Sequence, residues 1–321
     1  MNGFAIELVD LTKKYGSFTA VDHLNLSVKK GEVFGLLGPN GARKSPTILM
    51  ILGLTDPTNG HASVCGIDPT AKPIEVKRLV GYLPEDVGFY DDRTGFDNLM
   101  YTARLNSIPE TEARQRGERL LERVGLSAEA GKKTGLYSRG MRQRLGLADV
   151  LIKNPEIIIL DEPTLGIDPK GVREFLNLIL ELSKEEGLTV LFSSHHLHQV
   201  QQVCDRVGLF VKGKLLAEGN IQSLAEKLFT RSPYVIEAGI SGNGITDNTV
   251  DLLLKPLNGV EDITLKDGYY EISCSRDVTA EIAKKIVESG LLLTHLSRKE
   301  YGLDDIYYRY FDGGEDHERI N

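Results

Sequence analysis

The sequence predicts an α/β fold, with a parallel sheet sandwiched by helices, followed by a small α+β domain. Short, nearly continuous apolar runs occupy residues 32–38, 157–163, 189–195 and 206–213. Runs of this kind are typical of strands that are buried on both faces. Helical patterns separate the runs, and this alternation predicts the α/β core. After about residue 230 the composition changes, and a polar Gly/Asn-rich loop occupies residues 241–249.

Helices are predicted from apolar spacing and from their end signals. The segment 169–187 opens with Pro169 and closes with Gly187, as helices prefer. From about residue 60 to 150 the pattern is mostly helical, with apolar residues at three- and four-residue spacing in 95–105, 110–126 and 139–152. We interpret a stretch at about 85–150 as a helical insertion within the α/β core.

The C-terminal segment predicts a second, smaller domain. Its expected elements are a strand at 233–240, a helix at 248–256, strands at 260–266 and 268–275, a helix at 277–289, a strand at 291–298 and a helix at 303–311. This order is typical of a split-βαβ domain. We therefore expect domains at 1–228 and 229–321. Four tyrosines near the end lie at roughly helical spacing and are interpreted as packing residues: Tyr301, Tyr307, Tyr308 and Tyr310.

Composition narrows the class of protein. The chain has 321 residues, a net charge of −8 and no basic run, which argues against broad nucleic-acid binding. Its three cysteines, Cys65, Cys204 and Cys274, lie far apart, which argues against a disulfide framework or a zinc site. No stretch approaches 18 apolar residues, and the N-terminus lacks a secretory signal. We expect a cytoplasmic protein that reaches a membrane only through a partner.

A glycine-rich loop connects the apolar run at 32–38 to an apolar helical segment. In such a loop, backbone N–H groups and a helix N-terminus converge on phosphate oxygens. Lys44 would reach the terminal phosphates, and the Ser45 hydroxyl would take a Mg²⁺ position. The loop consists of Gly38, Pro39, Asn40, Gly41, Ala42, Arg43, Lys44, Ser45 and Pro46. The alternative is a glycine-rich turn that binds no ligand.

Two residues of this loop depart from the phosphate-binding pattern. Arg43 stands where glycine is expected, so its side chain either crowds the phosphates or forces backbone strain of roughly 1–2 kcal/mol. It also adds a positive charge beside a polyphosphate. Pro46 has no N–H, which removes a hydrogen bond worth about 1.5–3 kcal/mol, and it biases Ser45 away from helical dihedrals. Proline is nevertheless tolerated in a first helical turn. If the strain at Arg43 and the hydrogen bond lost at Pro46 both applied in full, nucleotide binding would weaken by about two to three orders of magnitude.

Further polar residues follow the buried runs. The run 157–160 ends in Asp161 and Glu162, where one acid can hold Mg²⁺ through water and the next can polarise an attacking water. Such a pair is unspecific alone, because buried strands often end in acids. Another run ends at His195, and Ser138 precedes an amphipathic helix whose N-terminus suits an anion.

Taken in order, these motifs resemble those of the nucleotide-binding domain of ABC transporters. The set is GPNGxxKS, YSRGMRQRL, IIILDEPTLGIDP and SSH, and the resemblance covers about residues 4–225. The forms YS-x-GM and PTLGIDP resemble the drug- and antibiotic-exporter branch, many members of which carry a C-terminal accessory domain ending in a segment like LDDIYYRYF. The resemblance implies a P-loop NTPase fold and the cofactors ATP and Mg²⁺. For the accessory domain, our hypothesis is a role in dimer contact or regulation.

The resemblance implies a role for each motif residue. Tyr15 matches the aromatic residue that stacks on adenine, although a core residue in an edge strand is the alternative. Asp161 matches the Walker B aspartate and Glu162 the general base. His195 matches the switch histidine that contacts the γ-phosphate. Glu85 stands where most members have a glutamine that senses Mg²⁺, so the expected metal set is Ser45, Glu85 and Asp161.

The signature motif implies an assembly. Ser138 and Gly140 match residues that bind the γ-phosphate held by an opposite subunit, and Asp168 matches a loop that communicates across the dimer. The resemblance therefore implies a head-to-tail homo- or heterodimer that ATP closes. It also implies a separate transmembrane permease, which would place the chain on the inner face of the cell membrane. His196 and His198 are interpreted as surface helix residues.

Three functional hypotheses remain. The first is an active ATPase that drives export. The second is a degenerate member with weak or no hydrolysis that acts as a binding or regulatory partner. The third is a soluble ABC protein without a transport role, and the single domain without long coiled coils argues against it. Retention of Glu162 and His195 favours the first hypothesis, whereas Arg43 and Pro46 favour the second.

Overall fold

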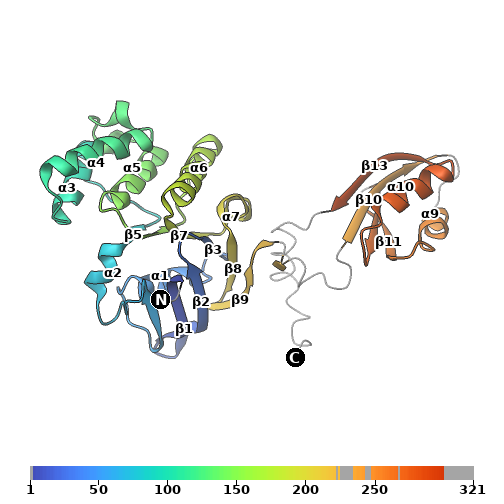
Figure 1. Cartoon of the computed structure of the whole chain (residues 1–321), viewed down its shortest axis with the longest axis horizontal. Helices are drawn as coiled ribbons and strands as arrows, with labels where there is room; N and C mark the ends of the chain where they lie inside the picture. The colour runs from blue at the N-terminus through green and yellow to red at the C-terminus, as the bar shows by residue number, and fades with distance from the viewer. Residues whose placement is uncertain (1–2, 222, 225–233, 243–246, 267, 300–321) are drawn as a thin grey trace. The chain divides into compact units, whose positions relative to one another are not determined.

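The computed structural model of the chain describes residues 3–221, 223–224, 234–242, 247–266 and 268–299. They belong to two compact units, residues 1–220 and 221–321 (Figure 1). The predicted domain boundary at 228/229 lies outside the described residues.

A six-stranded sheet forms the centre of the first unit, in the order β5-β6-β7-β3-β8-β9. The first five strands are parallel, and β9 pairs antiparallel with β8. Every residue of β3, β6 and β7 is buried, which explains their continuous apolar sequences. The bounds are β3 Val33–Leu37, β5 Val80–Leu83, β6 Ile157–Asp161, β7 Thr189–Ser194, β8 Arg206–Val211 and β9 Lys214–Gly219. The four predicted strands are thus β3, β6, β7 and β8.

A three-stranded antiparallel sheet, β2-β1-β4, lies beside α1. One apolar cluster, which includes Leu8, Leu26, Phe34 and Ile48, joins this sheet, α1 and the central sheet. The bounds are β1 Phe4–Tyr15, β2 Phe18–Lys29, β4 Asn59–Val64 and α1 Lys44–Ile51. The cluster fixes the start of α1 between the two sheets.

Three helices, α3, α4 and α5, gather at one end of the first unit, and β1 and β2 lie at the other (Figure 1). The helices of this unit after α1 are α2 Pro73–Leu79, α3 Gly95–Leu105, α4 Glu110–Arg123, α5 Arg139–Leu151, α6 Pro169–Glu186 and α7 Leu197–Val203, with 3-10 helices at Ser127–Glu129 and Thr134–Leu136. The predicted helices match α3 to α6. The expectation of mostly helical structure from residue 60 is wrong for β4 and β5. The polar sequence of β4 becomes a strand because it pairs with β1.

The second unit contains a four-stranded antiparallel sheet in the order β11-β12-β10-β13. Strand β12 lies between β10 and β11, which is the predicted split-βαβ arrangement. Its own core includes Ile236, Ile272 and Ile282. The bounds are β10 Tyr234–Ser241, α9 Asp247–Leu254, β11 Val260–Lys266, β12 Tyr269–Cys274, α10 Thr279–Glu288 and β13 Leu292–Lys299. The predicted helix 303–311 and the four tyrosines lie outside the described residues.

Candidate nucleotide-binding site

Three of the four predicted motifs meet at the carboxyl ends of three adjacent strands. Gly38 follows β3, Asp161 ends β6, and His195 follows β7. Because these strands are parallel neighbours, their carboxyl ends lie at one edge of the sheet. Ligands of open parallel sheets bind outside this edge.

The glycine-rich loop is held tightly at its start. A Cβ atom at Gly38 would lie 2.2 Å from the Phe210 carbonyl oxygen, so only glycine fits there. The Ala42 N–H then donates to the Pro39 carbonyl at 3.0 Å, which closes the turn. Asn40 is exposed in this turn. Gly41 has φ +80°, a left-handed conformation that favours glycine.

Helix α1 begins at Lys44 and contains Pro46 as its third residue. The predicted bias of Ser45 away from helical dihedrals is therefore wrong. A proline in the first turn lacks an N–H that would have no partner inside the helix, so the helix forms around it. What Pro46 removes is one N–H that could face an anion at this helix start.

Arg43 was expected either to crowd the phosphates or to strain the backbone, and the structure shows the strain. Its φ of +73° and ψ of +34° are left-handed, so the backbone is strained, at a cost of roughly 1–2 kcal/mol. Its Nη1 atom donates to the carbonyls of Thr19 at 2.6 Å and Lys212 at 3.2 Å. The guanidinium also lies 4.1 Å from the ring centroid of Phe18. The side chain thus extends to β2 and to the turn between β8 and β9.

Lys44, Glu162 and His195 form a compact polar cluster. The Lys44 ammonium donates to the Gly38 carbonyl at 2.6 Å and lies 3.1 Å from Glu162 Oε1. The other carboxylate oxygen, Oε2, lies 2.9 Å from His195 Nδ1. Lys44 and Glu162 are buried, and His195 is partly exposed. The carboxylate of Glu162 is therefore fixed between a cation and an imidazole.

Asp161 and Ser45 lie next to this cluster. The Ser45 hydroxyl donates to Asp161 Oδ2 at 3.5 Å. Burial raises the pKa of Asp161, and the neighbouring Glu162 raises it further, whereas hydrogen bonds and Lys44 act in the opposite direction. Burial, together with the negative charge of Asp161, also raises the pKa of Tyr82 to about 12. Tyr82 is a site neighbour that the sequence analysis missed.

The predicted metal residues are only partly brought together. The hydroxyl of Ser45 and the carboxylate of Asp161 are hard oxygen donors of the kind that Mg²⁺ prefers. Glu85 is exposed after β5, and its backbone carbonyl accepts from Gln143 Nε2 at 2.9 Å. Across the described residues, no group of three His, Cys, Asp or Glu side chains is arranged to hold a metal ion.

The signature residues form a second cluster. Ser138 caps α5, where its hydroxyl accepts from the Met141 N–H at 3.3 Å. Asp168 caps α6 and accepts from the Gly171 N–H at 3.2 Å. A Cβ atom at Gly140 would meet Ile167 at 3.4 Å, so the signature helix start and the loop before α6 lie together. Ser138 and Asp168 are exposed.

The side chain of Tyr15, the predicted adenine-stacking residue, is exposed. Tyr15 is 52% exposed, so the alternative that it is a core residue in an edge strand is wrong. It pairs with Phe18 across the β1–β2 hairpin, and Phe18 is a second exposed ring that the sequence analysis did not single out. His196 and His198 are exposed as predicted, although the His196 ring lies 4.0 Å from that of His195.

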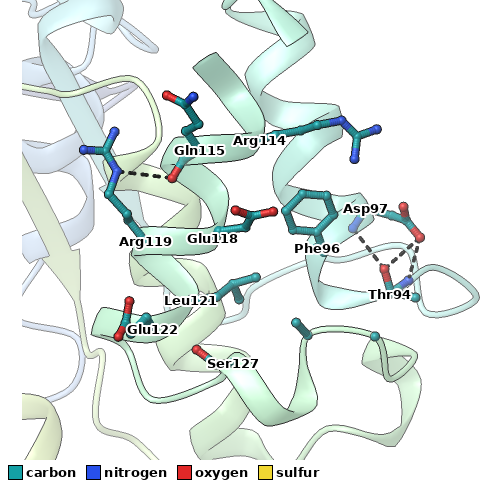
Figure 2. Close-up of a pocket in the computed structure, with 12 residues that line it drawn as sticks. Thr94, Phe96, Asp97, Arg114, Gln115, Glu118, Arg119, Leu121, Glu122 and Ser127 are labelled. Atoms are coloured by element: carbon teal, nitrogen blue, oxygen red, sulfur yellow. Dashed lines mark hydrogen bonds between the residues drawn. The ribbon is translucent and has the colours of Figure 1, made fainter. Parts of the chain in front are cut away.

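A separate cavity of about 1010 Å³ lies in the helical part of the first unit. Figure 2 shows Phe96 and Leu121 in its wall, and the hydrogen-bonded pair Thr94 and Asp97 at the start of α3. None of the predicted site residues is among the residues that line it. Among the helices of the described residues, none combines the length and apolarity needed to span a bilayer.

Comparisons with known proteins agree with the motifs. The family model for ABC transporters matches residues 21–165. The bacitracin transport ATP-binding protein BcrA of Bacillus licheniformis is 36% identical over 96% of this chain and 98% of its own length. The linearmycin resistance ATP-binding protein LnrL of Bacillus subtilis (strain 168) is 34% identical over 89% of each chain.

Among solved structures, a dimer of the ATP-binding cassette MJ0796 with bound ADP and Pi, in a post-hydrolysis state, matches with a TM-score of 0.60. It is 25% identical and covers 67% of this chain and 98% of that chain. The α/β fold with its P-loop cassette is therefore confirmed. The chain belongs to the family of ABC transporter ATP-binding proteins.

Proposed function

We propose that this chain hydrolyses ATP and thereby powers an ABC-type exporter. The observation that carries the proposal is the cluster of Lys44, Glu162 and His195, which lies beside Ser45 and Asp161 at one sheet edge. These are the residue types that phosphoryl transfer to water needs: a cation for the phosphates, a base for the water and oxygen donors for a metal.

The geometry suggests how the cluster would act. An incoming γ-phosphate would compete with Glu162 for the Lys44 ammonium. Glu162 Oε1 would then be released to accept a proton from the attacking water, while His195 keeps its contact with Oε2. Mg²⁺, held by Ser45 and Asp161, would neutralise charge on the phosphate oxygens.

We further propose that two such subunits act together on a separate membrane permease. Ser138, Gly140 and Asp168 are grouped at two helix starts, and the exposed side chains of Ser138 and Asp168 are available to a second subunit. The dimeric cassette with ADP and Pi supports this arrangement for a relative. The names of the bacitracin transport and linearmycin resistance proteins support an antibiotic or drug as the cargo, and the chain would lie on the inner face of the membrane through the permease.

A second candidate is a degenerate cassette that binds nucleotide weakly. The strained Arg43 and the missing N–H of Pro46 favour it. Against it stands the intact contact between Glu162 and both Lys44 and His195.

The decisive experiment measures ATP affinity and hydrolysis for the wild type, for Glu162→Gln, and for Arg43→Gly combined with Pro46→Thr. We expect hydrolysis in the wild type and its loss in Glu162→Gln, with ATP binding retained. If neither the wild type nor the loop variant hydrolysed ATP in the presence of the permease, the chain would be the degenerate form. Equal affinities of the wild type and the loop variant for inorganic tripolyphosphate, which lacks the base, would show that the two substitutions do not damage the phosphate half of the site.

A further inference from the structure

The Arg43 guanidinium lies against the start of β2, away from the rest of the glycine-rich loop. It lies 4.1 Å from the ring centroid of Phe18, within stacking range. Its Nη1 atom is held by the carbonyls of Thr19 at 2.6 Å and Lys212 at 3.2 Å. A guanidinium is planar and presents its donors in a rigid fork, so these partners fix its plane against the ring.

Phe18 belongs to a pair of exposed aromatic rings. Tyr15 and Phe18 are direct partners across the β1–β2 hairpin, and residues directly opposite each other present their side chains on the same face. Tyr15 is 52% exposed and Phe18 is 51% exposed. Two adjacent, half-exposed rings form a surface on which a flat, aromatic ligand can stack.

The backbone around Arg43 joins the hairpin to the phosphate loop. Gly213 donates from its N–H to the Ala42 carbonyl at 3.0 Å and accepts from the Asp22 N–H at 2.9 Å. A Cβ atom at Gly213 would lie 2.1 Å from the Ala20 carbonyl oxygen, so the β8–β9 turn is packed directly against β2. The Arg43 side chain adds its hydrogen bonds with Thr19 and Lys212 to this junction, next to the ring of Phe18.

We propose that Arg43 is a positioning residue for the nucleobase: it holds Phe18 beside Tyr15, so that the two rings receive the base of a nucleoside triphosphate. The inference rests on the proposed nucleotide site and deepens it. The arginine occupies a backbone conformation that suits glycine, and its side chain acts on the base half of the site instead of on the phosphates. Loss of the side chain should therefore weaken binding of a whole nucleotide and leave binding of a bare polyphosphate unchanged.

The test compares the dissociation constants of ATP and of inorganic tripolyphosphate, each with Mg²⁺, on the full chain. For Arg43→Ala we expect the constant for ATP to rise about tenfold and that for tripolyphosphate to stay within about twofold. Phe18→Leu should show the same selective loss, because it removes the ring that Arg43 positions. Arg93→Ala is the matched control, since Arg93 lies 5.3 Å from the ring of Tyr90 in the helical part. It should change neither constant.

Each other result has a defined meaning. If Arg43→Ala weakened ATP and tripolyphosphate equally, the side chain would act on the phosphates and the inference would be wrong. If Arg43→Ala changed neither constant, the inference would be wrong as well. A wild-type chain that bound neither compound would overturn the proposed nucleotide site itself. Binding of both by the wild type, without selectivity in Phe18→Leu, would overturn only the role of the aromatic pair.

Discussion

Lys44 Nζ lies 3.1 Å from Glu162 Oε1, and both side chains are buried. The two residues that would handle the phosphates and the attacking water thus form an ion pair with each other. A buried carboxylate is tolerated when a cation and a hydrogen-bond partner accompany it, and His195 supplies the second. Because the same two residues stabilise the fold and would act on the nucleotide, a substitution of either one should change both stability and activity.

Lys44→Met should destabilise the first unit. The substitution leaves the Glu162 carboxylate buried without its cation, which costs about 3–5 kcal/mol. Adding Glu162→Gln removes the uncompensated charge and should recover most of that loss without restoring activity. Urea unfolding followed by far-UV circular dichroism measures the effect in a chain that has no tryptophan.

Lys170→Met is a matched control for the Lys44→Met substitution. Lys170 lies 3.8 Å from Glu174 on α6, and both side chains are exposed. Breaking such a pair changes the free energy of unfolding by at most about 1 kcal/mol. If Lys44→Met had an equally small effect, the buried pair would not contribute to stability.

His195→Ala should lower the turnover of ATP more than its affinity. The imidazole holds Glu162 Oε2 at 2.9 Å, and loss of this contact frees the carboxylate to move. A misplacement of about 1 Å in a reacting group costs roughly 10²-fold in rate. Steady-state hydrolysis should therefore show kcat reduced about 100-fold, with KM nearly unchanged. His198→Ala alters an exposed residue of α7 and should leave both parameters at the wild-type level; a comparable loss in that control would contradict a specific role for His195.

Pro46→Ala should strengthen phosphate binding. The substitution restores an N–H at the third residue of α1 without adding a hydroxyl. A hydrogen bond to a charged group is worth about 1.5–3 kcal/mol, so the dissociation constant for ATP should fall at least tenfold. Binding of tripolyphosphate should improve by the same factor, because the new donor faces the phosphates. An unchanged constant would mean that this N–H does not reach the ligand.

Buried strands and local motifs were predictable from the sequence, and long-range contacts were not. The runs that became β3, β6 and β7 were visible because burial on both faces demands continuous apolar residues. Strand β4 was missed because its sequence, NGHASV, is polar and its conformation depends on pairing with β1. Helix α1 formed despite Pro46, since proline's position within the first turn decides its effect.

The same distinction applies to the site. The motif spacing predicted that Lys44, Asp161 and Glu162 belong to one site, and the structure brings these three residues together. The sequence could not indicate that the Arg43 side chain extends to Thr19 and Lys212, because that direction depends on where β2 and the β8–β9 turn lie in space. The influence of Asp161 on Tyr82 likewise follows from the parallel pairing of β5 with β6, which brings the two residues close together.

Asp149 should make stability depend on pH in the direction opposite to an ion-paired carboxylate. It lines a cavity of about 440 Å³ on α5, and within the described part of the chain its Oδ1 atom is enclosed without a hydrogen-bond partner. Burial raises its pKa to about 6, although a hydrogen bond from Thr102 and the charge of Lys153 oppose the shift. Between about pH 4 and pH 6 the folded state therefore binds more protons at this group than the unfolded state does.

The contribution of Asp149 to the free energy of unfolding consequently falls as the pH rises through this window. With a shift of roughly two pKa units, the loss reaches at most about 3 kcal/mol above pH 6. Asp149→Asn cannot ionise, so its stability relative to the wild type should increase from pH 4 to pH 7. Urea unfolding of both proteins across this range measures the difference, and Asp92→Asn, which removes an exposed carboxylate, controls for net charge. A difference that stayed constant with pH would show that Asp149 is as well solvated in the folded chain as in the unfolded one.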